Sequence, residues 1–209
     1  VTISNADNKV VQVDFICEVK ANSAGYTNGI GIQIDNLTSS QIESVTGTVY
    51  TENYVTLNAN GTEANQDKAV IILTDNEDNL IDEKTISVSF NPPITSSELG
   101  SAPFNPFIIA NGVRVQEIHM PYANFTSLGD NAIQIPGNGV TDDTNGNYVG
   151  ENGYPWSISL LHDFKVPKES TKIFDAYNHF VQWANSGGVS FTDWYKDNPG
   201  YRNADKLEE

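Results

Sequence analysis

Short segments in which apolar and polar residues alternate constrain the fold of this chain more than any other feature. From residue 11 to residue 19 every second side chain is apolar, which is the period of a strand that buries one face. Residues 69–73 are apolar throughout, as in a central strand. The other alternating positions are Ile30, Ile32 and Ile34, then Ile86, Val88 and Phe90, and finally Trp156, Ile158 and Leu160. The first two thirds of the chain is therefore expected to be mostly sheet.

A β-hairpin is predicted around Asn111-Gly112. Residues 107–110 and 113–116 have strand character on either side, and Asn-Gly readily adopts the positive φ angles of a type I′ turn. Many short strands separated by Asn, Gly, Pro and Asp residues favour an antiparallel β-sandwich of jelly-roll or Greek-key type. A βαβ fold would need amphipathic helices between the strands.

The C-terminal part of the chain has helical periodicity instead. An amphipathic helix is predicted to end near Gly187-Gly188, and a second, short helix is predicted over residues 192–196. The apolar positions at helical spacing are Ile173, Tyr177, Phe180 and Trp183. We expect these rings to form a core. The sequence thus predicts one domain over residues 1–209, a mainly β sandwich on which residues 165–209 pack as a helical extension.

The charge of the chain excludes some classes of partner. There are 27 acidic residues against 11 basic ones, giving a net charge of −16 that repels phosphate polyanions. Nucleic acids and anionic membrane surfaces are therefore not expected as partners. No stretch approaches the roughly 18 apolar residues of a membrane helix. The single Cys17 rules out a disulfide within the chain and is expected to be a small buried hydrophobe.

A loop rich in carboxylates and amides, residues 136–148, is the best candidate for a metal site. It contains no Lys or Arg, so either a cation or solvent must neutralise it. Glu117 and His119, two apart on the predicted hairpin strand, share a face and could join this loop at one end of the sandwich. A solvated loop beside a hydrogen-bonded strand end is the favoured interpretation, and Ca²⁺ is the metal expected if the loop binds one. The candidate ligands are Glu117, His119, Asp130, Asp142, Asp143 and Asn145.

Aromatic residues near the acidic loop suggest a second kind of site, for a glycan. Tyrosine and tryptophan rings can form a flat surface that stacks on sugar rings. Trp156 also begins an alternating segment, so it could instead point into the core. The aromatic residues in question are Tyr122, Tyr148, Tyr154 and Trp156.

Sequence motifs give no support for catalysis. The chain has no Gly-x-Ser-x-Gly elbow, phosphate loop or dinucleotide-binding glycine pattern. Zinc is disfavoured because His119, His162 and His179 lie in unrelated contexts and one Cys cannot supply a thiolate set. The abundance of carboxylates leaves a carbohydrate-active or ester hydrolase as an alternative. We expect a protein that is not an enzyme.

Six segments, taken together in their order and spacing, resemble the LruC domain family. They are residues 26–35 (YTNGIGIQID), 60–73 (NGTEANQDKAVIIL), 100–112 (GSAPFNPFIIANG), 117–121 (EIHMP), 154–157 (YPWS) and 183–195 (WANSGGVSFTDWY). The resemblance runs over nearly all of the chain. The family's Gly-Asp-Asp loop is similar to Thr141-Asp142-Asp143, whereas residues 122–131 depart from the family's Pro-rich, Thr-Asp pattern. The family therefore gives no support to ligand assignments in that segment.

The resemblance implies an exported domain of a bacterial surface or outer-membrane lipoprotein, in a family whose molecular role is largely uncharacterised. It also implies a lipid anchor on a Cys upstream of Val1, which would be the only link to the membrane; Cys17 is not that anchor. We expect a non-catalytic module in adhesion or envelope organisation, with a surface protein or a glycan as its partner. A glycan-binding module is the first alternative.

Overall fold

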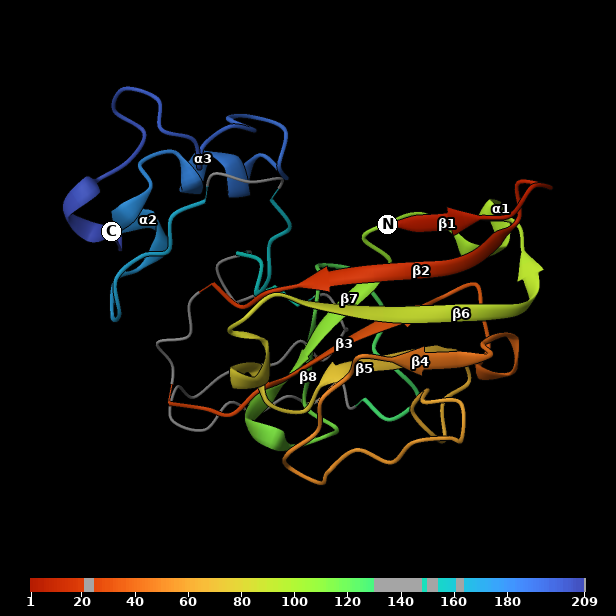
Figure 1. Ribbon diagram of the computed structural model, residues 1–209. Helices are drawn as coiled ribbons and strands as arrows, with labels where there is room; N and C mark the ends of the chain where they lie inside the picture. The colour runs from red at the N-terminus through yellow and green to blue at the C-terminus, as the bar shows by residue number, and fades with distance from the viewer. Residues whose placement is uncertain (21–24, 130–147, 150–153, 161–163, 209) are drawn as a thin grey trace. The chain divides into compact units, whose positions relative to one another are not determined.

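The computed structural model describes residues 1–20, 25–129, 148–149, 154–160 and 164–208 (Figure 1). The chain divides into two compact units, Val1–Tyr148 and Val149–Glu209. The expected single domain with an extension from residue 165 stays a prediction. Among the described residues, no helix is long and apolar enough to cross a membrane.

The first unit contains two four-stranded antiparallel sheets, which confirms the predicted sandwich-like β architecture (Figure 1). The first sheet has the order β1-β2-β6-β4 and the second has the order β5-β3-β7-β8. The strands of the first sheet are β1 (Thr2–Ser4), β2 (Val10–Cys17), β6 (Lys84–Ile94) and β4 (Ser44–Thr46). Those of the second are β5 (Ala69–Thr74), β3 (Gly29–Ile34), β7 (Asn105–Ile109) and β8 (Glu117–His119). Short helical pieces connect them: η1 (Ser39–Gln41), η2 (Glu77–Leu80), α1 (Ser96–Leu99) and η3 (Ala110–Gly112).

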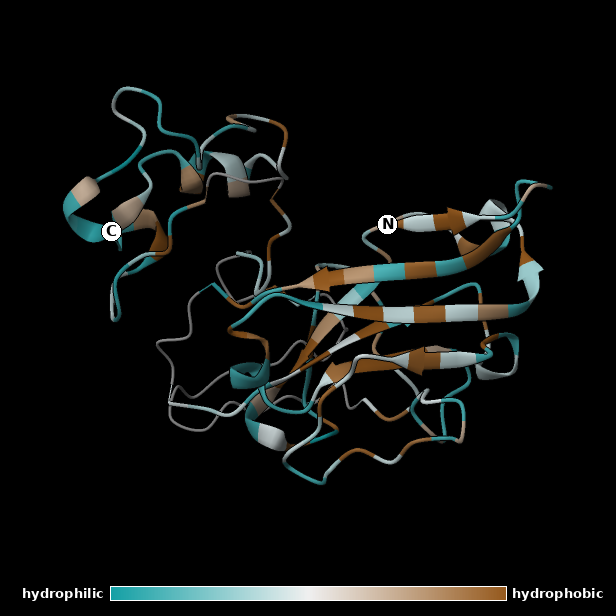
Figure 2. Cartoon of the chain, in the orientation of Figure 1, coloured by the Kyte–Doolittle hydropathy of each residue, from teal (hydrophilic) through white to brown (hydrophobic). Residues whose placement is uncertain are grey.

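The main core lies between the two sheets and is built by the alternating residues. Val13 of β2 and Ile86 and Val88 of β6 are buried there. Figure 2 shows hydrophobic and hydrophilic bands alternating along β2 and β6. A bulge between Val10 and Gln12 shifts the register, so Val10 is buried where strict alternation predicts Val11. The alternation thus predicts the strand, while the bulge decides which residue enters the core.

Strand β5 is buried on both faces, although it lies at the edge of its sheet and not at the predicted central position. The segment before it covers its free edge: the Val49 amide donates to the Leu73 carbonyl at 3.5 Å, and the Glu63 amide donates to the Val70 carbonyl at 2.8 Å. Val70 faces away from the main core and belongs to a second apolar cluster on the outer face of this sheet. A continuous apolar run therefore indicates burial on both faces and does not indicate a central position.

The second unit contains short helical pieces around an aromatic core. These are α2 (Ile173–Ala176), α3 (Phe180–Asn185) and η4 (Ala204–Lys206). The single helix predicted here is broken because Tyr177 adopts an extended backbone and pairs with Arg202. Residues 192–196 form turns and not a helix, and residues 156–160 do not form the predicted strand. The predicted burial of the rings is confirmed for the cluster that we call the aromatic cluster: Ala176, Tyr177, Phe180, Trp194, Tyr195 and Leu207.

Candidate functional site

The hairpin that presents Glu117 and His119 has the predicted turn but a longer loop. Asn111 and Gly112 both have positive φ angles, 53° and 65°, as the Asn-Gly pair predicts. Strand pairing resumes only at Glu117, because the Ala110 amide donates to the Gln116 carbonyl and closes a wider loop. The predicted strand over residues 113–116 is therefore wrong, and Val113 and Val115 are exposed.

Glu117 and His119 share one face of β8, as predicted, and both are fully buried there. They lie on the outer face of the second sheet, opposite Ile109 and Phe107 of β7. The His119 ring stacks on the Phe107 ring with the centroids 4.8 Å apart. A Cβ at Gly31 of β3 would collide with the Phe107 ring, so the glycine lets this ring lie flat on the sheet.

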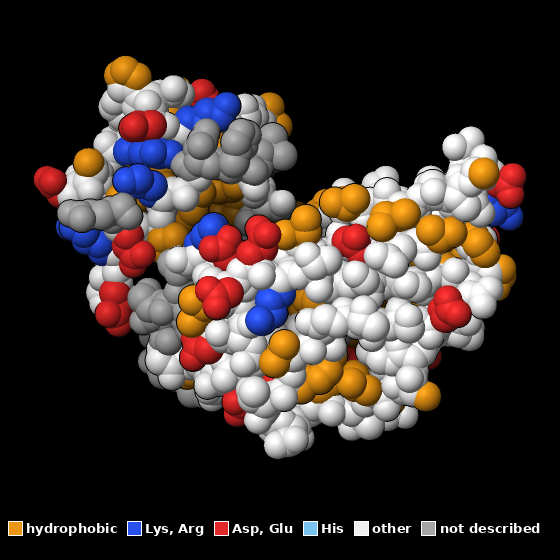
Figure 3. Space-filling model, viewed as in Figure 1, with side chains coloured by type: hydrophobic (Ala, Val, Ile, Leu, Met, Phe, Trp, Pro, Cys, Tyr) orange, Lys and Arg blue, Asp and Glu red, His pale blue; other side chains and the backbone are white. Residues whose placement is uncertain are grey.

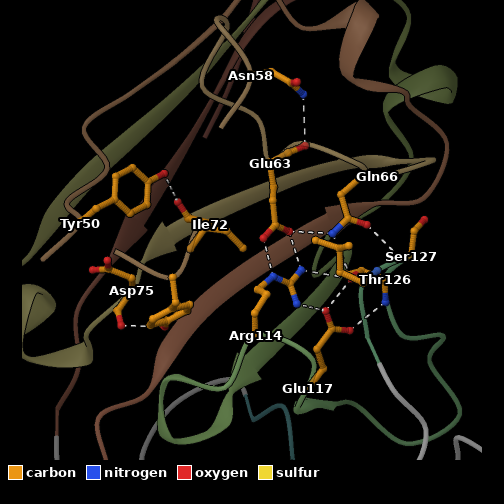
Figure 4. A network of polar contacts seen from close by, with 12 residues as sticks. Tyr50, Asn58, Glu63, Gln66, Ile72, Asp75, Arg114, Glu117, Thr126 and Ser127 are labelled. Atoms are coloured by element: carbon orange, nitrogen blue, oxygen red, sulfur yellow. Dashed lines mark hydrogen bonds and ion pairs between the residues drawn. The ribbon is translucent and has the colours of Figure 1, made fainter. Parts of the chain in front are cut away.

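Arg114, from the hairpin loop, lies between two buried carboxylates (Figure 4). Its Nη2 donates to Oε2 of Glu63 at 2.5 Å, its Nε donates to Oε1 of the same residue, and its Nη1 donates to Oε1 of Glu117 at 2.5 Å. The side chains of Arg114, Glu63 and Glu117 are 11%, 1% and 0% exposed. Burial alone would lower the pKa of Arg114, but the hydrogen bonds and charges of the two glutamates raise it. The guanidinium is therefore charged and held bidentately by Glu63.

Thr126 and His119 complete the coordination of Glu117. The Thr126 amide donates to Oε2 of Glu117 at 2.8 Å and its hydroxyl donates to Oε1 at 2.5 Å. His119 Nε2 lies 2.8 Å from the same Oε2, and its Nδ1 lies 2.7 Å from Oδ1 of Asn105. Burial alone would raise the pKa of Glu117, but the hydrogen bonds from His119 and Thr126 and the charge of Arg114 outweigh it and lower the pKa. Each carboxylate oxygen of Glu117 thus has two partners.

Gln66 links this group to the chain around residue 127. Its Nε2 donates to Oε2 of Glu63 at 2.7 Å and to Oγ1 of Thr126 at 3.1 Å, and its Oε1 accepts from the Ser127 amide at 2.9 Å. Gly129 is needed nearby because a Cβ there would collide with Oε2 of Glu117. We call Glu63, Gln66, Arg114, Glu117, His119 and Thr126 the Arg114 cluster. It fastens residues 122–129 to the outer face of the second sheet.

The Arg114 cluster has no open position for a metal ion. The oxygens of Glu63 and Glu117 accept hydrogen bonds from protein donors, so a cation would have to displace those donors. Within the described part of the chain, no group of three or more His, Cys, Asp or Glu residues is arranged to hold a metal. Asp130, Asp142, Asp143 and Asn145 lie outside the described residues, so metal binding by the acidic loop stays a prediction.

An open polar cleft of about 450 Å³ lies beside the Arg114 cluster. Strand pairing explains its position: Ile34 of β3 lies opposite Ala69 of β5, which brings the residues just beyond them, Asp35 and Lys68, to one edge. The cleft is lined by Gln33, Asp35, Asp67, Lys68, Asn124, Phe125, Thr126 and Ser127. These residues come from three distant segments with no shared motif, so the sequence alone gave no signal for the cleft.

The four aromatic candidates do not form one surface. Tyr148 is buried, with its ring 5.2 Å from that of His119, so it is not available for stacking on a sugar. Tyr122 is 76% exposed in the first unit. Tyr154 and Trp156 are half-buried in the second unit, where they line a largely apolar cavity of about 550 Å³ together with Phe180. A glycan site at Tyr122, Tyr154 and Trp156 stays a prediction.

Comparison with known proteins gives one match. A family model described as a domain of unknown function, DUF4842, matches residues 8–195. The match includes every strand of the two sheets except β1, all residues of the Arg114 cluster and most of the aromatic cluster. No curated protein and no solved structure matches the chain.

Proposed function

We propose that this chain, which belongs to the DUF4842 family, is a non-catalytic binding module of a bacterial surface lipoprotein. The finer assignment to the LruC family rests on the six segments that resemble it, two of which, residues 60–73 and 117–121, supply Glu63, Gln66, Glu117 and His119. The module serves in adhesion or envelope organisation.

The observation that carries this proposal is the position of the open cleft beside a closed charge cluster. Gln66 and Glu117 accept hydrogen bonds from the amides of Ser127 and Thr126, and this fixes the cleft wall at residues 124–127. The buried ionisable groups are therefore used to shape a surface. Under this proposal they do not act on an external substrate.

A glycan is the partner whose chemistry fits the cleft best. Asp35, Asp67 and Asn124 present oxygens and an amide that can bond sugar hydroxyls, and the half-exposed Phe125 ring can stack on a sugar face. The chain has a net charge of −16, and a few separate acidic side chains are visible on the face of the first unit in Figure 3. This charge favours neutral or amino sugars over anionic ones.

The test is retention on an array of bacterial and host polysaccharides. We expect the intact chain to bind at least one neutral or amino-sugar glycan, and we expect Phe125→Ala and Asp67→Asn each to weaken binding at least tenfold. Phe191→Ala, which changes a comparably exposed ring in the second unit, is the matched control and should bind like the wild type. If no glycan is retained, or if the cleft variants bind normally, the glycan assignment is wrong.

The hydrolase alternative makes the opposite prediction. Turnover of a glycan or ester substrate that disappears in Glu117→Gln or in His119→Gln would contradict a non-catalytic role. Under our proposal, a substrate screen shows no such turnover, because both side chains are closed off by protein partners.

Stabilisation by Ca²⁺ is a separate part of the proposal. Millimolar Ca²⁺ is expected to raise the melting temperature relative to EDTA, because an ion that binds only the folded state stabilises it. Asp142→Ala combined with Asp143→Ala should abolish that shift. An identical melting curve in Ca²⁺ and EDTA would remove the metal from the account.

A further inference from the structure

The Arg114 cluster brings a hydroxyl and a carboxamide together in a buried place. Oγ1 of Thr126 lies 3.1 Å from Nε2 of Gln66, and the carboxamide carbon is one bond beyond that nitrogen. Thr126 is 1% exposed. The two residues are 60 positions apart in the sequence, so neither strand pairing nor local turn chemistry requires the contact.

The hydroxyl of Thr126 has a base beside it. It donates its proton to Oε1 of Glu117 at 2.5 Å, and the other oxygen of that carboxylate is held by His119 Nε2 at 2.8 Å. A hydroxyl that donates to a buried, oriented carboxylate is the arrangement that activates an oxygen nucleophile. Nη2 of Arg114 lies 3.2 Å from the same Oγ1, where its positive charge stabilises negative charge that develops on oxygen.

The carboxamide of Gln66 is held by a partner at each end. Its Oε1 accepts from the Ser127 amide at 2.9 Å, which polarises the carbonyl and would hold an oxyanion. Its Nε2 donates to Oε2 of Glu63 at 2.7 Å. The Glu63 carboxylate can only accept a hydrogen bond, and the Ser127 backbone N–H can only donate one. These two partners therefore fix the positions of Nε2 and Oε1 in the Gln66 side chain.

We propose that Thr126 and Gln66 react with each other to form an intramolecular ester. Oγ1 of Thr126 bonds to Cδ of Gln66 as Glu117 takes the hydroxyl proton, giving a tetrahedral intermediate whose oxyanion is held by the Ser127 amide. That proton passes to the nitrogen, the C–N bond breaks, and ammonia leaves. The products are one ester and one ammonia, so no oxidant or other reactant is consumed.

The cleft gives the leaving group a way out, since Thr126 and Ser127 line it. The cross-link would join the segment before β5 to the segment after β8 and would close the outer face of the second sheet covalently. The reaction occurs once in each chain and needs no external substrate. It therefore stands independently of the proposed binding function.

The test is the intact mass of the purified, folded chain, followed by peptide mapping. We expect a mass lower than the sequence mass by one ammonia, about 17 Da. Trypsin should then release residues 21–68 joined to residues 115–165, since cleavage after Lys20, Lys68, Arg114 and Lys165 separates the two partners. Fragmentation must place the bond between Gln66 and Thr126, because succinimide formation at an Asn-Gly pair gives the same loss of mass.

Variants separate the ester from other losses of ammonia. Thr126→Val and Gln66→Glu should each restore the full mass, the second because its ester would have to release water instead of ammonia. Thr126→Ser keeps the nucleophile and should retain the cross-link. Circular dichroism identifies which variants are folded. If Thr126→Val does not fold, the masses of the two single variants Thr126→Ser and Gln66→Glu still test the proposal. An unmodified mass for the folded wild type, or a loss that maps only to Asn-Gly, overturns the proposal.

Discussion

The Arg114 cluster of the first unit and the aromatic cluster of the second unit are stabilised in different ways. In the Arg114 cluster each oxygen of Glu117 has assigned partners at 2.5–2.8 Å. In the aromatic cluster the rings pack edge to face, as Tyr177 and Trp194 do at 5.0 Å, and the buried Trp194 Nε1 has no hydrogen-bond partner among the described residues. Burial of apolar area stabilises without direction, whereas paired charges fix positions. We therefore expect stability to depend more strongly on exact side-chain positions in the Arg114 cluster than in the aromatic cluster.

Removal of the central cation should have the largest effect. Arg114→Met leaves two buried carboxylates without their counter-charge, and we expect it to lower the free energy of unfolding by about 4 kcal/mol. Urea unfolding gives the measurement, followed by far-UV circular dichroism for the sheets of the first unit and by tryptophan fluorescence for the second unit. Arg202→Met is the matched control in the second unit, where the guanidinium bonds a backbone carbonyl of Tyr195, and its cost should be about 1–2 kcal/mol. Equal costs would contradict a special role for Arg114.

Truncation of an aromatic ring in the second unit should come next. Phe180→Ala removes a fully buried ring and should lower the free energy of unfolding by about 3 kcal/mol. All three tryptophans, Trp156, Trp183 and Trp194, belong to the second unit, so tryptophan fluorescence follows that unit alone. The cost should be insensitive to salt, because no charge is changed. If the stability cost of Phe180→Ala changed strongly with salt concentration, the aromatic cluster would not be stabilised by apolar burial alone.

A methyl group inserted into the Arg114 cluster should have an intermediate effect. Gly129→Ala places a Cβ against Oε2 of Glu117, and we expect a loss of about 2 kcal/mol as the carboxylate is displaced. Gly25→Ala is the control, because a Cβ there meets no atom within 4 Å, and it should change the stability by less than about 0.5 kcal/mol. Similar melting temperatures for the two variants would show that the cluster adapts more readily than its geometry suggests.

Acid should weaken the first unit selectively, with the smallest effect of the series. The pKa of Glu117 is lowered from 4.5 in the folded state, so the ionised form contributes stability above that value, and the contribution is lost as pH falls through the folded pKa. Glu117→Gln should therefore flatten the decline in stability between about pH 5 and pH 2. Circular dichroism should show this change, whereas tryptophan fluorescence should not. If the stability of Glu117→Gln declines with falling pH as steeply as that of the wild type, then the pKa of Glu117 is not lowered by folding.

The sequence predicted correctly that Glu117 and His119 share one face of a strand, but it did not predict which residues they contact. Alternation identified β2, β3 and β6, and a spacing of two placed Glu117 and His119 on one face, because side-chain direction follows from the period of a strand. The same pattern could not reveal that Glu117 binds Arg114 and Thr126. Glu63 lies 51 residues before Arg114, and only the path of the segment that covers β5 brings them together. Interactions set by long-range folding leave no local signal.

Local patterns also failed where a distant segment competed. The helix predicted through Tyr177 is interrupted because the backbone of this residue forms an isolated antiparallel β-bridge with Arg202 instead. The strand expected at Trp156 has apolar alternation, yet the structure gives its residues no strand partner among those described. Periodicity records which side chains are buried, while backbone pairing depends on a neighbour.

Hydrogen exchange tests most directly the claim that the Arg114 cluster holds residues 122–129 in place and so shapes the cleft. The measurement compares amide exchange in the wild type and in Glu117→Gln, under conditions where both are folded. We predict that exchange over residues 122–129 becomes about tenfold faster, since the Thr126 amide loses its charged acceptor, while β2 and β6 stay protected. Unchanged protection of residues 122–129 would contradict the account.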